Sequence, residues 1–276
     1  MPNHDIFSVP IDTISREEVE DRVGDTLAGD AFRRIATVNP EFLVRARRDT
    51  RFRENLLSAD LRIPDGFGIV LDGLLSGRWV ERYPGADLLH FVLAEAEKLS
   101  ERDTDRRSDH SEEHGQRNAP FEKGSTRYSG GGISIFLLIR SDGLSSLAEI
   151  RSAIRKRYPN LSVEGTELDA GVDSIPDKAR SATIVFCDFG APEQEYALES
   201  LRKDPGDIRI AMGIGGAFDY MTEKRKRAPR WMCAIGLEWL FRLAVQPGRI
   251  GRIWTAVVVF PFLCLSDRMR SGNKNR

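Results

Sequence analysis

The segment "SATIVFCDFGAPEQEYALESLRKDPGDIRIAMGIGG", residues 181–216, decides the fold. It begins and ends with short runs rich in β-branched residues, at 181–189 and 207–216, and the stretch between them has the apolar spacing of a helix. A strand, a helix and a second strand in this order predict two parallel strands joined by a crossover helix.

The same alternation extends over most of the chain, with further strand-like runs at 33–39, 61–66 and 133–139. We therefore expect an α/β fold, a Rossmann-like and mostly parallel sheet with helices on both faces. The expected division is an α/β domain at 1–221 and a helical, membrane-associating C-terminal appendage at 222–276. In such sheets ligands bind outside the carboxyl ends of the strands, so residues directly after a strand are the first site candidates.

Composition restricts the class of protein. The 276 residues are 41% hydrophobic and 30% charged, enough for a sizeable core. Cys187, Cys233 and Cys264 are far apart and form no Cys-x-x-Cys pair, which disfavours a disulfide framework or a structural zinc site. This cysteine pattern predicts a location in the reducing cytoplasm. The first residues have no basic stretch followed by an apolar one, so no signal peptide is expected.

Residues 101–132 are polar, almost free of aliphatic side chains, and end in three glycines. This composition predicts a disordered or mobile insertion. Asp103 and Asp105 form an Asp-x-Asp pattern, and His110 and His114 follow. Because metal ligands need a rigid scaffold, a solvated charged loop is the better interpretation and no metal site is predicted.

The C-terminal segment is basic. From residue 222 onward, twelve Lys/Arg stand against three Asp/Glu, which predicts contact with an anionic membrane or nucleic acid. The apolar run at 253–265 favours lipid over nucleic acid, but it is too short to span a bilayer and Pro261 interrupts it. A segment lying on the bilayer surface and a helix docked on the core both remain open, and the two are compatible.

The glycines at 213, 215 and 216 follow a predicted strand. Position 218 is Phe, so the Gly-x-Gly-x-x-Gly pattern of dinucleotide sites is not met. The remaining interpretation of these glycines is a tight turn whose backbone N–H groups approach a phosphate. The triplet Asp188-Phe189-Gly190 resembles a kinase motif, but no other kinase motif accompanies it.

Asp65 follows the strand-like run at 61–64 and precedes a glycine. Its carboxylate lies beside apolar Ile63 and Phe67 in the sequence, an environment that raises proton affinity and suits a general base. An N-cap of the next helix is the alternative, and the spacing alone does not separate the two.

Six segments in order resemble the WecG/TagA/CpsF family of bacterial glycosyltransferases over about residues 30–270. They are "TVNPEFL" (37–43), "ADLRIPDGFGIV" (59–70), "ERYPGADLL" (81–89), "FGAPEQE" (189–195), "GIGGAFDYMTEKRKRAPRW" (213–231) and "GLEWLFRLAVQPGRIGR" (236–252). The resemblance implies an inverting, metal-independent transfer of a sugar, N-acetylmannosamine or a related hexose, from a UDP-sugar. The implied acceptor is a polyprenyl-diphosphate-linked sugar at the cytoplasmic face of the membrane. No cofactor is implied.

The resemblance also assigns residues, with Asp65 as the catalytic base. Implied to bind the substrates or shape their site are Thr37, Asn39, Arg82, Gly85, Asp87, Gln194, Gly213, Gly215 and Gly216. Implied to meet the lipid diphosphate or the leaving diphosphate are Arg227, Arg230, Arg242, Arg249 and Arg252. Guanidinium groups suit diphosphates because they donate two parallel hydrogen bonds.

One departure from the family pattern concerns the turn after the strand at 133–139. The family usually has a glycine pair there, whereas this chain has Arg140-Ser141-Asp142-Gly143. The identity of the donor sugar is therefore open, and two alternatives are kept: a family member that binds a sugar nucleotide without transferring it, and a basic nucleic-acid-binding module. A homo-oligomer is compatible with the sequence, which does not define the oligomeric state.

Overall fold

The computed structural model describes residues 3–113, 132–169 and 175–274. The described chain has a six-stranded sheet with the order β4-β3-β8-β7-β5-β6 and a separate hairpin, β1 (Asn3–Ile6) and β2 (Val9–Asp12). Two compact units result: unit 1 comprises Met1–Glu18, Ile35–Gly85 and Arg225–Arg276, and unit 2 comprises Val19–Arg34 and Ala86–Lys224.

Unit 2 contains the strand–helix–strand segment predicted first. Strand β7 (Ile184–Cys187) pairs in parallel with β8 (Ile210–Gly213), and α7 (Glu193–Ser200) connects them, as expected. The strands β5 (Ser134–Arg140) and β6 (Ser162–Leu168) extend this parallel set. The other helices of unit 2 are α1 (Arg16–Ala28, which begins in unit 1), α5 (Gly85–Glu113), α6 (Leu147–Arg157), α8 (Phe218–Met221), η1 (Asp177–Ser181), η2 (Leu201–Lys203) and η3 (Gly215–Ala217).

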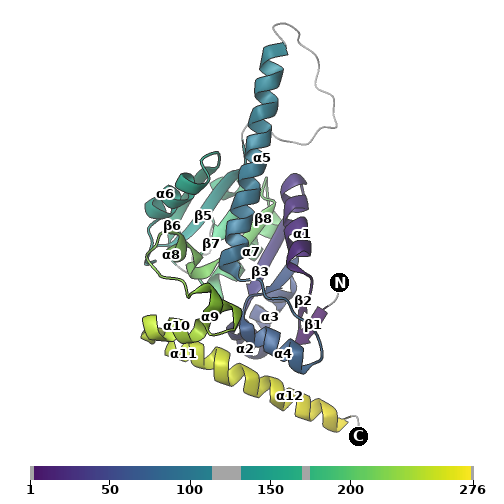
Figure 1. Ribbon diagram of the computed structural model, residues 1–276. Coiled ribbons are helices and arrows are strands. Elements are labelled where there is room, and N and C mark those ends of the chain that lie inside the picture. The colour runs from purple at the N-terminus through teal and green to yellow at the C-terminus, as the bar shows by residue number, and fades with distance from the viewer. Residues whose placement is uncertain (1–2, 114–131, 170–174, 275–276) are drawn as a thin grey trace. The chain divides into compact units, whose positions relative to one another are not determined.

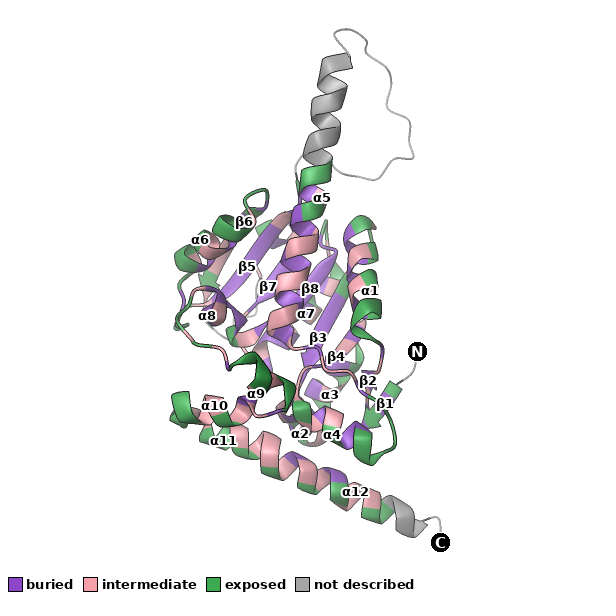
Figure 2. Cartoon of the chain, viewed as in Figure 1, coloured by how far each residue is buried: buried purple, intermediate pink, exposed green. Residues whose placement is uncertain are grey.

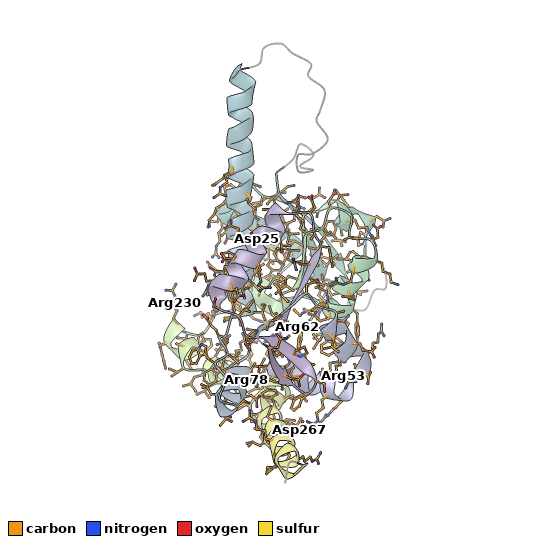
Figure 3. The ribbon with its side chains drawn as sticks, turned by 90° about the vertical axis from the view of Figure 1, so that its right-hand side faces the viewer. Asp25, Arg53, Arg62, Arg78, Arg230 and Asp267 are labelled. Atoms are coloured by element: carbon orange, nitrogen blue, oxygen red, sulfur yellow. The ribbon has the colours of Figure 1, made fainter. Side chains whose placement is uncertain are left out.

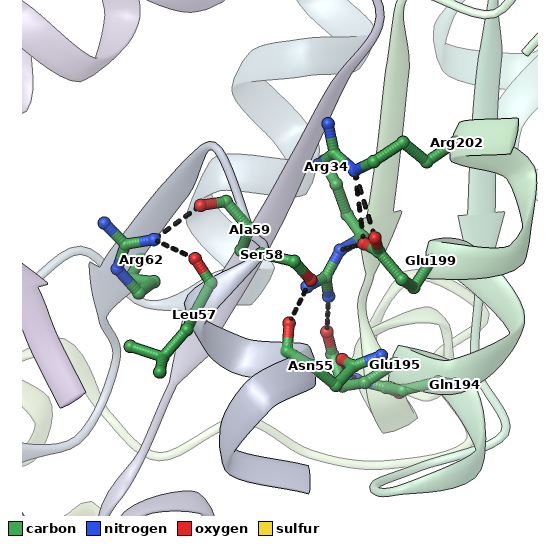
Figure 4. Close-up of polar contacts among 10 residues, drawn as sticks. All are labelled: Arg34, Asn55, Leu57, Ser58, Ala59, Arg62, Gln194, Glu195, Glu199 and Arg202. Carbon is green, nitrogen blue, oxygen red and sulfur yellow. Dashed lines mark hydrogen bonds and ion pairs between the residues drawn. The ribbon is translucent and has the colours of Figure 1, made fainter. Parts of the chain in front are cut away.

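All four residues of β7 are buried, and so are all four of β8 (Figure 2). This is the pattern of parallel strands covered on both faces, which explains why these runs are continuously apolar. One ion pair is part of this interior: the guanidinium of fully buried Arg34, at the start of β3, binds Glu195 of α7 at 2.6 Å and Glu199 at 2.9 Å (Figure 4).

Unit 1 contains β4 (Leu61–Pro64) and, from Ile35 onward, β3 (Arg33–Val38). The two strands pair in parallel, in register from Ile35 opposite Leu61 to Val38 opposite Pro64. The helices of unit 1 are α2 (Pro40–Arg48), α3 (Thr50–Leu57), α4 (Phe67–Leu75), α9 (Arg230–Ala234) and α10 (Glu238–Val245) (Figure 1). From Pro247 to Lys274 the chain is helical throughout, as η4 (Pro247–Arg249), α11 (Ile250–Trp254), the π-helical turn η5 (Thr255–Val259) and α12 (Phe260–Lys274).

The C-terminal helix docks on other elements of unit 1. Phe260 is buried and its ring meets that of Phe7 edge to face, with centroids 5.9 Å apart. Asp267, labelled in Figure 3, accepts hydrogen bonds from Arg47 of α2 at 2.6 and 2.9 Å. The segment after 224 therefore packs within the same compact unit as residues 35–85.

Two expectations need correction. The predicted irregular segment from 101 is helical in its first part, since α5 continues to Glu113; residues 114–131 lie outside the described ranges. An existing helix is extended easily because each added residue brings a hydrogen bond, and Glu and Arg are good helix formers.

The second correction concerns Pro261, which does not end the C-terminal helix. The preceding turn is π-helical, with Phe260 N–H bonded to Thr255 O. A wider turn leaves room for the proline ring. It also changes which backbone carbonyl is left without a hydrogen bond, because proline has no N–H to donate. Residues 247–270 thus form a 24-residue helix whose length and composition are sufficient to cross a membrane, which by itself is weak evidence that it does so.

Candidate functional site

Asp65 lies directly after β4, as predicted. Its N–H donates to Val38 O at 2.8 Å, which continues the β3–β4 pairing by one residue. The N-cap of α4 is Gly66 and not Asp65, and no side chain accepts a capping hydrogen bond at this helix start. The Oδ1 of Asp65 instead accepts a hydrogen bond from the N–H of Gly85, the first residue of α5, at 3.2 Å.

Two glycines near Asp65 are closely packed, Gly66 more tightly than Gly85. A Cβ on Gly66 would lie 2.2 Å from the Pro40 ring, and a Cβ on Gly85 would lie 3.1 Å from Thr37 Oγ1. Thr37 is buried against Gly85 and is not among the residues that line the adjoining cavity. Thr37 therefore packs against Gly85, the residue whose N–H donates to Asp65.

A cavity of about 150 Å³ opens above Asp65, and all of its lining residues belong to unit 1. Asn39 lines it while its Oδ1 accepts the Phe42 N–H at 3.0 Å as the N-cap of α2. Arg82, Glu238 and Arg242 line the same cavity. Residues from the first third and from the end of the chain therefore form one small chamber, lined by both polar and apolar side chains, around the carboxyl of Asp65.

Glu238 links the two arginines of this chamber. Its Oε2 accepts a hydrogen bond from Arg82 Nη2 at 2.6 Å, and its Oε1 accepts one from Arg242 Nη2. Arg82 also donates to the backbone carbonyl of Asp65 and, at 3.3 Å, to that of Cys233. Sequence reasoning missed Glu238, since a glutamate at the start of a helix ordinarily indicates only a favourable dipole interaction.

The charges in the chamber set the proton affinity of both carboxyls. Burial raises the pKa of Asp65, and Arg82 and Arg242 oppose that effect without cancelling it. Burial also acts to raise the pKa of Glu238, but Arg242 and Arg82 outweigh it, so the pKa is lowered. Glu238 is thus held as a carboxylate, while Asp65 has the higher proton affinity that a general base needs.

The predicted diphosphate-binding arginines are only partly brought together. Arg242 and Arg252 line the cavity, and Arg252 Nε also binds Glu41 Oε2 at 2.6 Å. Arg227, Arg230 and Arg249 are not among the lining residues. Arg230 is exposed at the start of α9 (Figure 3).

In unit 2 the glycine turn after β8 is organised by Gln194. Its Oε1 accepts the N–H of Gly190 at 3.1 Å and that of Gly215 at 3.3 Å, and its Nε2 donates to Glu195 at 3.0 Å. A Cβ on Gly213 would lie 2.4 Å from Gln194 Nε2, and Gly215 has φ +48°. Gln194 therefore stabilises the turn, and the φ of Gly216, −78°, lies outside the left-handed region.

Asp188 was given no role from the sequence. It follows the four buried residues of β7, and its Oδ1 accepts the Arg140 N–H at 2.7 Å. Burial raises the pKa of Asp188 to about 7; Asp219 and Asp142 also raise it, while Arg140 opposes them. In the sequence, the position of Asp188 directly after a predicted strand could have marked it as a site candidate.

Arg140 and Asp142, in the turn that departs from the family pattern, form an ion pair.

Asp87 is in the first turn of α5, in unit 2, and does not line the described cavity. Over the described residues, no group of three or more His, Cys, Asp or Glu side chains is placed to hold a metal ion. The side chains of Asp103, Asp105 and His110 are outside that description, as is His114 altogether.

Comparison with known proteins adds two findings. A model of the family described as "Glycosyl transferase WecG/TagA/CpsF family" matches residues 4–102 and 121–274. The chain is 25% identical, over 96% of its length and 87% of the relative's, to an N-acetylglucosaminyldiphosphoundecaprenol N-acetyl-beta-D-mannosaminyltransferase of Bacillus subtilis (strain 168). It is 27% identical to a protein of the same name from Bacillus spizizenii, over 79% of this chain and 74% of that one.

Proposed function

Since the chain belongs to the WecG/TagA/CpsF family of glycosyltransferases, we propose that it transfers N-acetylmannosamine or a related hexose from a UDP-sugar to a polyprenyl-diphosphate-linked sugar. The named relatives act on N-acetylglucosaminyldiphosphoundecaprenol, which supports an acceptor of this lipid-linked class. The proposed product is an intermediate of a cell-surface polysaccharide or teichoic acid.

The observation that carries this proposal is the carboxyl of Asp65 in the cavity beside two arginines. In the proposed reaction Asp65 takes the proton of the acceptor hydroxyl while that oxygen forms a bond to the anomeric carbon of the donor. The bond from this carbon to the UDP oxygen breaks with its electron pair on UDP. Attack opposite the leaving group inverts the anomeric centre.

Negative charge grows on the departing diphosphate, and we assign its stabilisation to arginines and backbone N–H groups rather than to a metal. We assign this role to Arg242 and Arg252, and their place in the lining of the cavity of Asp65 supports the assignment. The glycine turn, whose shape Gln194 stabilises by accepting the N–H groups of Gly190 and Gly215, is proposed to lie against the nucleotide of the donor.

We propose a peripheral location at the cytoplasmic face of the membrane, and the C-terminal segment supports the contact with the membrane. It combines the excess of basic residues with an apolar helix at 247–270, most of which is not buried. Apolar side chains with flanking arginines are the composition of helices that lie in the headgroup region of anionic bilayers.

The test is release of UDP by the purified protein from a panel of UDP-sugars, with a short-chain prenyl-diphosphate GlcNAc acceptor. We expect release only when a donor and the acceptor are both present. Loss of the general base in Asp65→Asn should lower kcat by about 10²–10⁴-fold. An Asp65→Asn protein that is folded by circular dichroism and turns over normally would contradict the role of Asp65.

A second candidate function rests on the turn after β5, where Arg140 and Asp142 pair in place of the usual glycines. A chain altered there could bind a sugar nucleotide without transferring it. Tight UDP-sugar binding in calorimetry, together with no UDP release from any donor in the panel, would select this alternative.

A further inference from the structure

Helix α4 has its polar and apolar sides reversed compared with a surface helix in water. Its one charged residue, Asp72, is 7% exposed and faces inward, where it meets His4 Nε2 at 2.8 Å. Leu71, Leu74 and Leu75 are exposed, the last two by 51% and 59%. These positions share one face because they are three or four residues apart.

The apolar face continues past the end of the helix. Trp79, in the loop after α4, is 74% exposed, the largest value among the exposed large hydrophobic residues of the described chain. The preceding Arg78, labelled in Figure 3, is anchored to the hairpin by a hydrogen bond to Asn3 O at 2.6 Å. A tryptophan beside an arginine is typical of segments at the boundary between lipid and water.

Helix α4 is connected directly to the C-terminal helix of the same unit. Arg268 of α12 donates to Asp72 Oδ1 and to Ser76 Oγ, both at 2.6 Å. That C-terminal helix also carries exposed apolar side chains. These side chains are spaced at helical intervals: Trp254, Val258, Phe262, Leu265 and Met269.

We propose that the outer face of α4, formed by Leu71, Leu74, Leu75 and Trp79, inserts into the lipid bilayer as a second membrane contact beside α12. This inference rests on the proposed action at a membrane. Exposed apolar surface of this continuity marks an interaction site rather than ordinary protein surface.

Charge selects lipid over a second copy of the chain as the occupant. The C-terminal helix beside α4 carries four arginines and one acidic residue between positions 247 and 270, so two copies that met through α4 and this helix would repel each other. Anionic headgroups are attracted by the same charge, and the acyl region accepts the leucines.

The insertion would bring the proposed base close to its lipid-linked substrate. Asp65 lies two residues before the first residue of α4, and Leu74 and Leu75 end that helix. Nine residues of α-helix are about 13 Å long, so a bilayer contact at the end of α4 keeps Asp65 within roughly that distance of the headgroups. A diphosphate anchored by a polyprenyl chain lies in that region.

The experiment measures binding of the full-length protein to phosphatidylcholine–phosphatidylglycerol vesicles by flotation, without substrate. We expect the triple variant Leu74→Ser, Leu75→Ser and Trp79→Ser to lose at least about tenfold in vesicle affinity, since binding scales with buried apolar area. Leu144→Ser, which removes an exposed leucine from unit 2, is the matched control and should bind like wild type.

A second measurement covers the case in which the triple variant does not fold. Leu75→Cys in a Cys233→Ser background is labelled with an environment-sensitive fluorophore, Cys187 and Cys264 being buried. Emission should shift to the blue on vesicle addition, and the same label at Leu144→Cys should not respond.

Unchanged vesicle affinity of the folded triple variant, or no shift at position 75, would overturn the proposal. So would a triple variant that changes from oligomer to monomer in light scattering while its vesicle affinity stays the same, since the face would then bind a second copy. Activity with the short-chain acceptor in solution tests the proposed function separately.

Discussion

At the scale of single residues, the proton affinity of Asp65 depends on a side chain more than 150 positions away in the sequence. Glu238 is a carboxylate that raises the pKa of Asp65, and it also holds Arg82 and Arg242, whose charges lower that pKa. One residue thus positions the arginines and limits their effect on the base.

The variant Glu238→Gln tests this balance. It removes a negative charge from the surroundings of Asp65 and leaves both arginines, so the pKa of Asp65 should fall. The acid limb of kcat/KM should then move to lower pH, and kcat above the limb should decrease because the base is weaker. The measurement is the pH–rate profile of both proteins; lower activity with an unshifted limb would indicate a structural role only.

Asp188 makes stability depend on pH. Its pKa is about 7 in the folded protein against 3.8 without the fold, so the stability it contributes is present at low pH. That contribution is lost as pH rises from about 4 to about 7, because the unfolded state gives up the proton in this range while the folded state keeps it. Wild type should therefore lose thermal stability between about pH 4 and pH 7 more steeply than Asp188→Asn, whose side-chain oxygen still accepts the Arg140 N–H.

Thermal denaturation at several pH values measures this difference. Asp177→Asn, which changes a carboxylate with a fully exposed side chain, is the control and should keep the wild-type slope. Parallel curves for wild type and Asp188→Asn would show that Asp188 titrates at an ordinary pKa.

At the scale of elements, the C-terminal helix combines a docked face with an exposed apolar one. Phe260 and Cys264 face inward, whereas Phe262 and Leu265 are exposed. Docked-helix and membrane-surface interpretations of this segment were both compatible with the sequence. The structure confirms the docking, and the membrane contact remains a proposal.

Two phenylalanines on this helix provide a matched pair. Phe260 is 1% exposed and Phe262 is 66% exposed. Phe260→Ala should weaken docking of the helix by about 3–5 kcal/mol, whereas Phe262→Ala should stay within about 0.5 kcal/mol. Hydrogen exchange of residues 247–274 measures the effect. Equal protection in the two variants would contradict the packing described for Phe260.

At the scale of the whole molecule, the C-terminal segment is part of the unit that contains Asp65. Removing residues 225–276 deletes the Glu238 partner of Arg82 and uncovers Gly68, which now lies against Phe260. We expect the truncated protein to lose turnover and to aggregate because apolar surface becomes exposed. A truncation from residue 271 is the control, and a fully active protein without 225–276 would refute the assignment.

Much of this architecture could be predicted from local pattern. Runs such as 184–187 and 210–213 are continuously apolar, and this predicts parallel strands buried on both faces. The position of Asp65 at a strand end followed from the same pattern. Residues 101–113 and Pro261 were misjudged because composition and proline content describe average tendencies, which a neighbouring helix or a π-helical turn overrides.

The sequence by itself determined the order of strands and helices, the family, and Asp65 as the candidate base. These features depend on apolar periodicity and on motifs, both of which involve residues close together in the chain. Only the tertiary structure determined which charged side chains form ion pairs: Arg34 with Glu195, Arg82 with Glu238, and Arg268 with Asp72. Each of these charged groups could pair with many others in an unfolded chain. Their choice depends on which distant segments the packed core brings within hydrogen-bond distance.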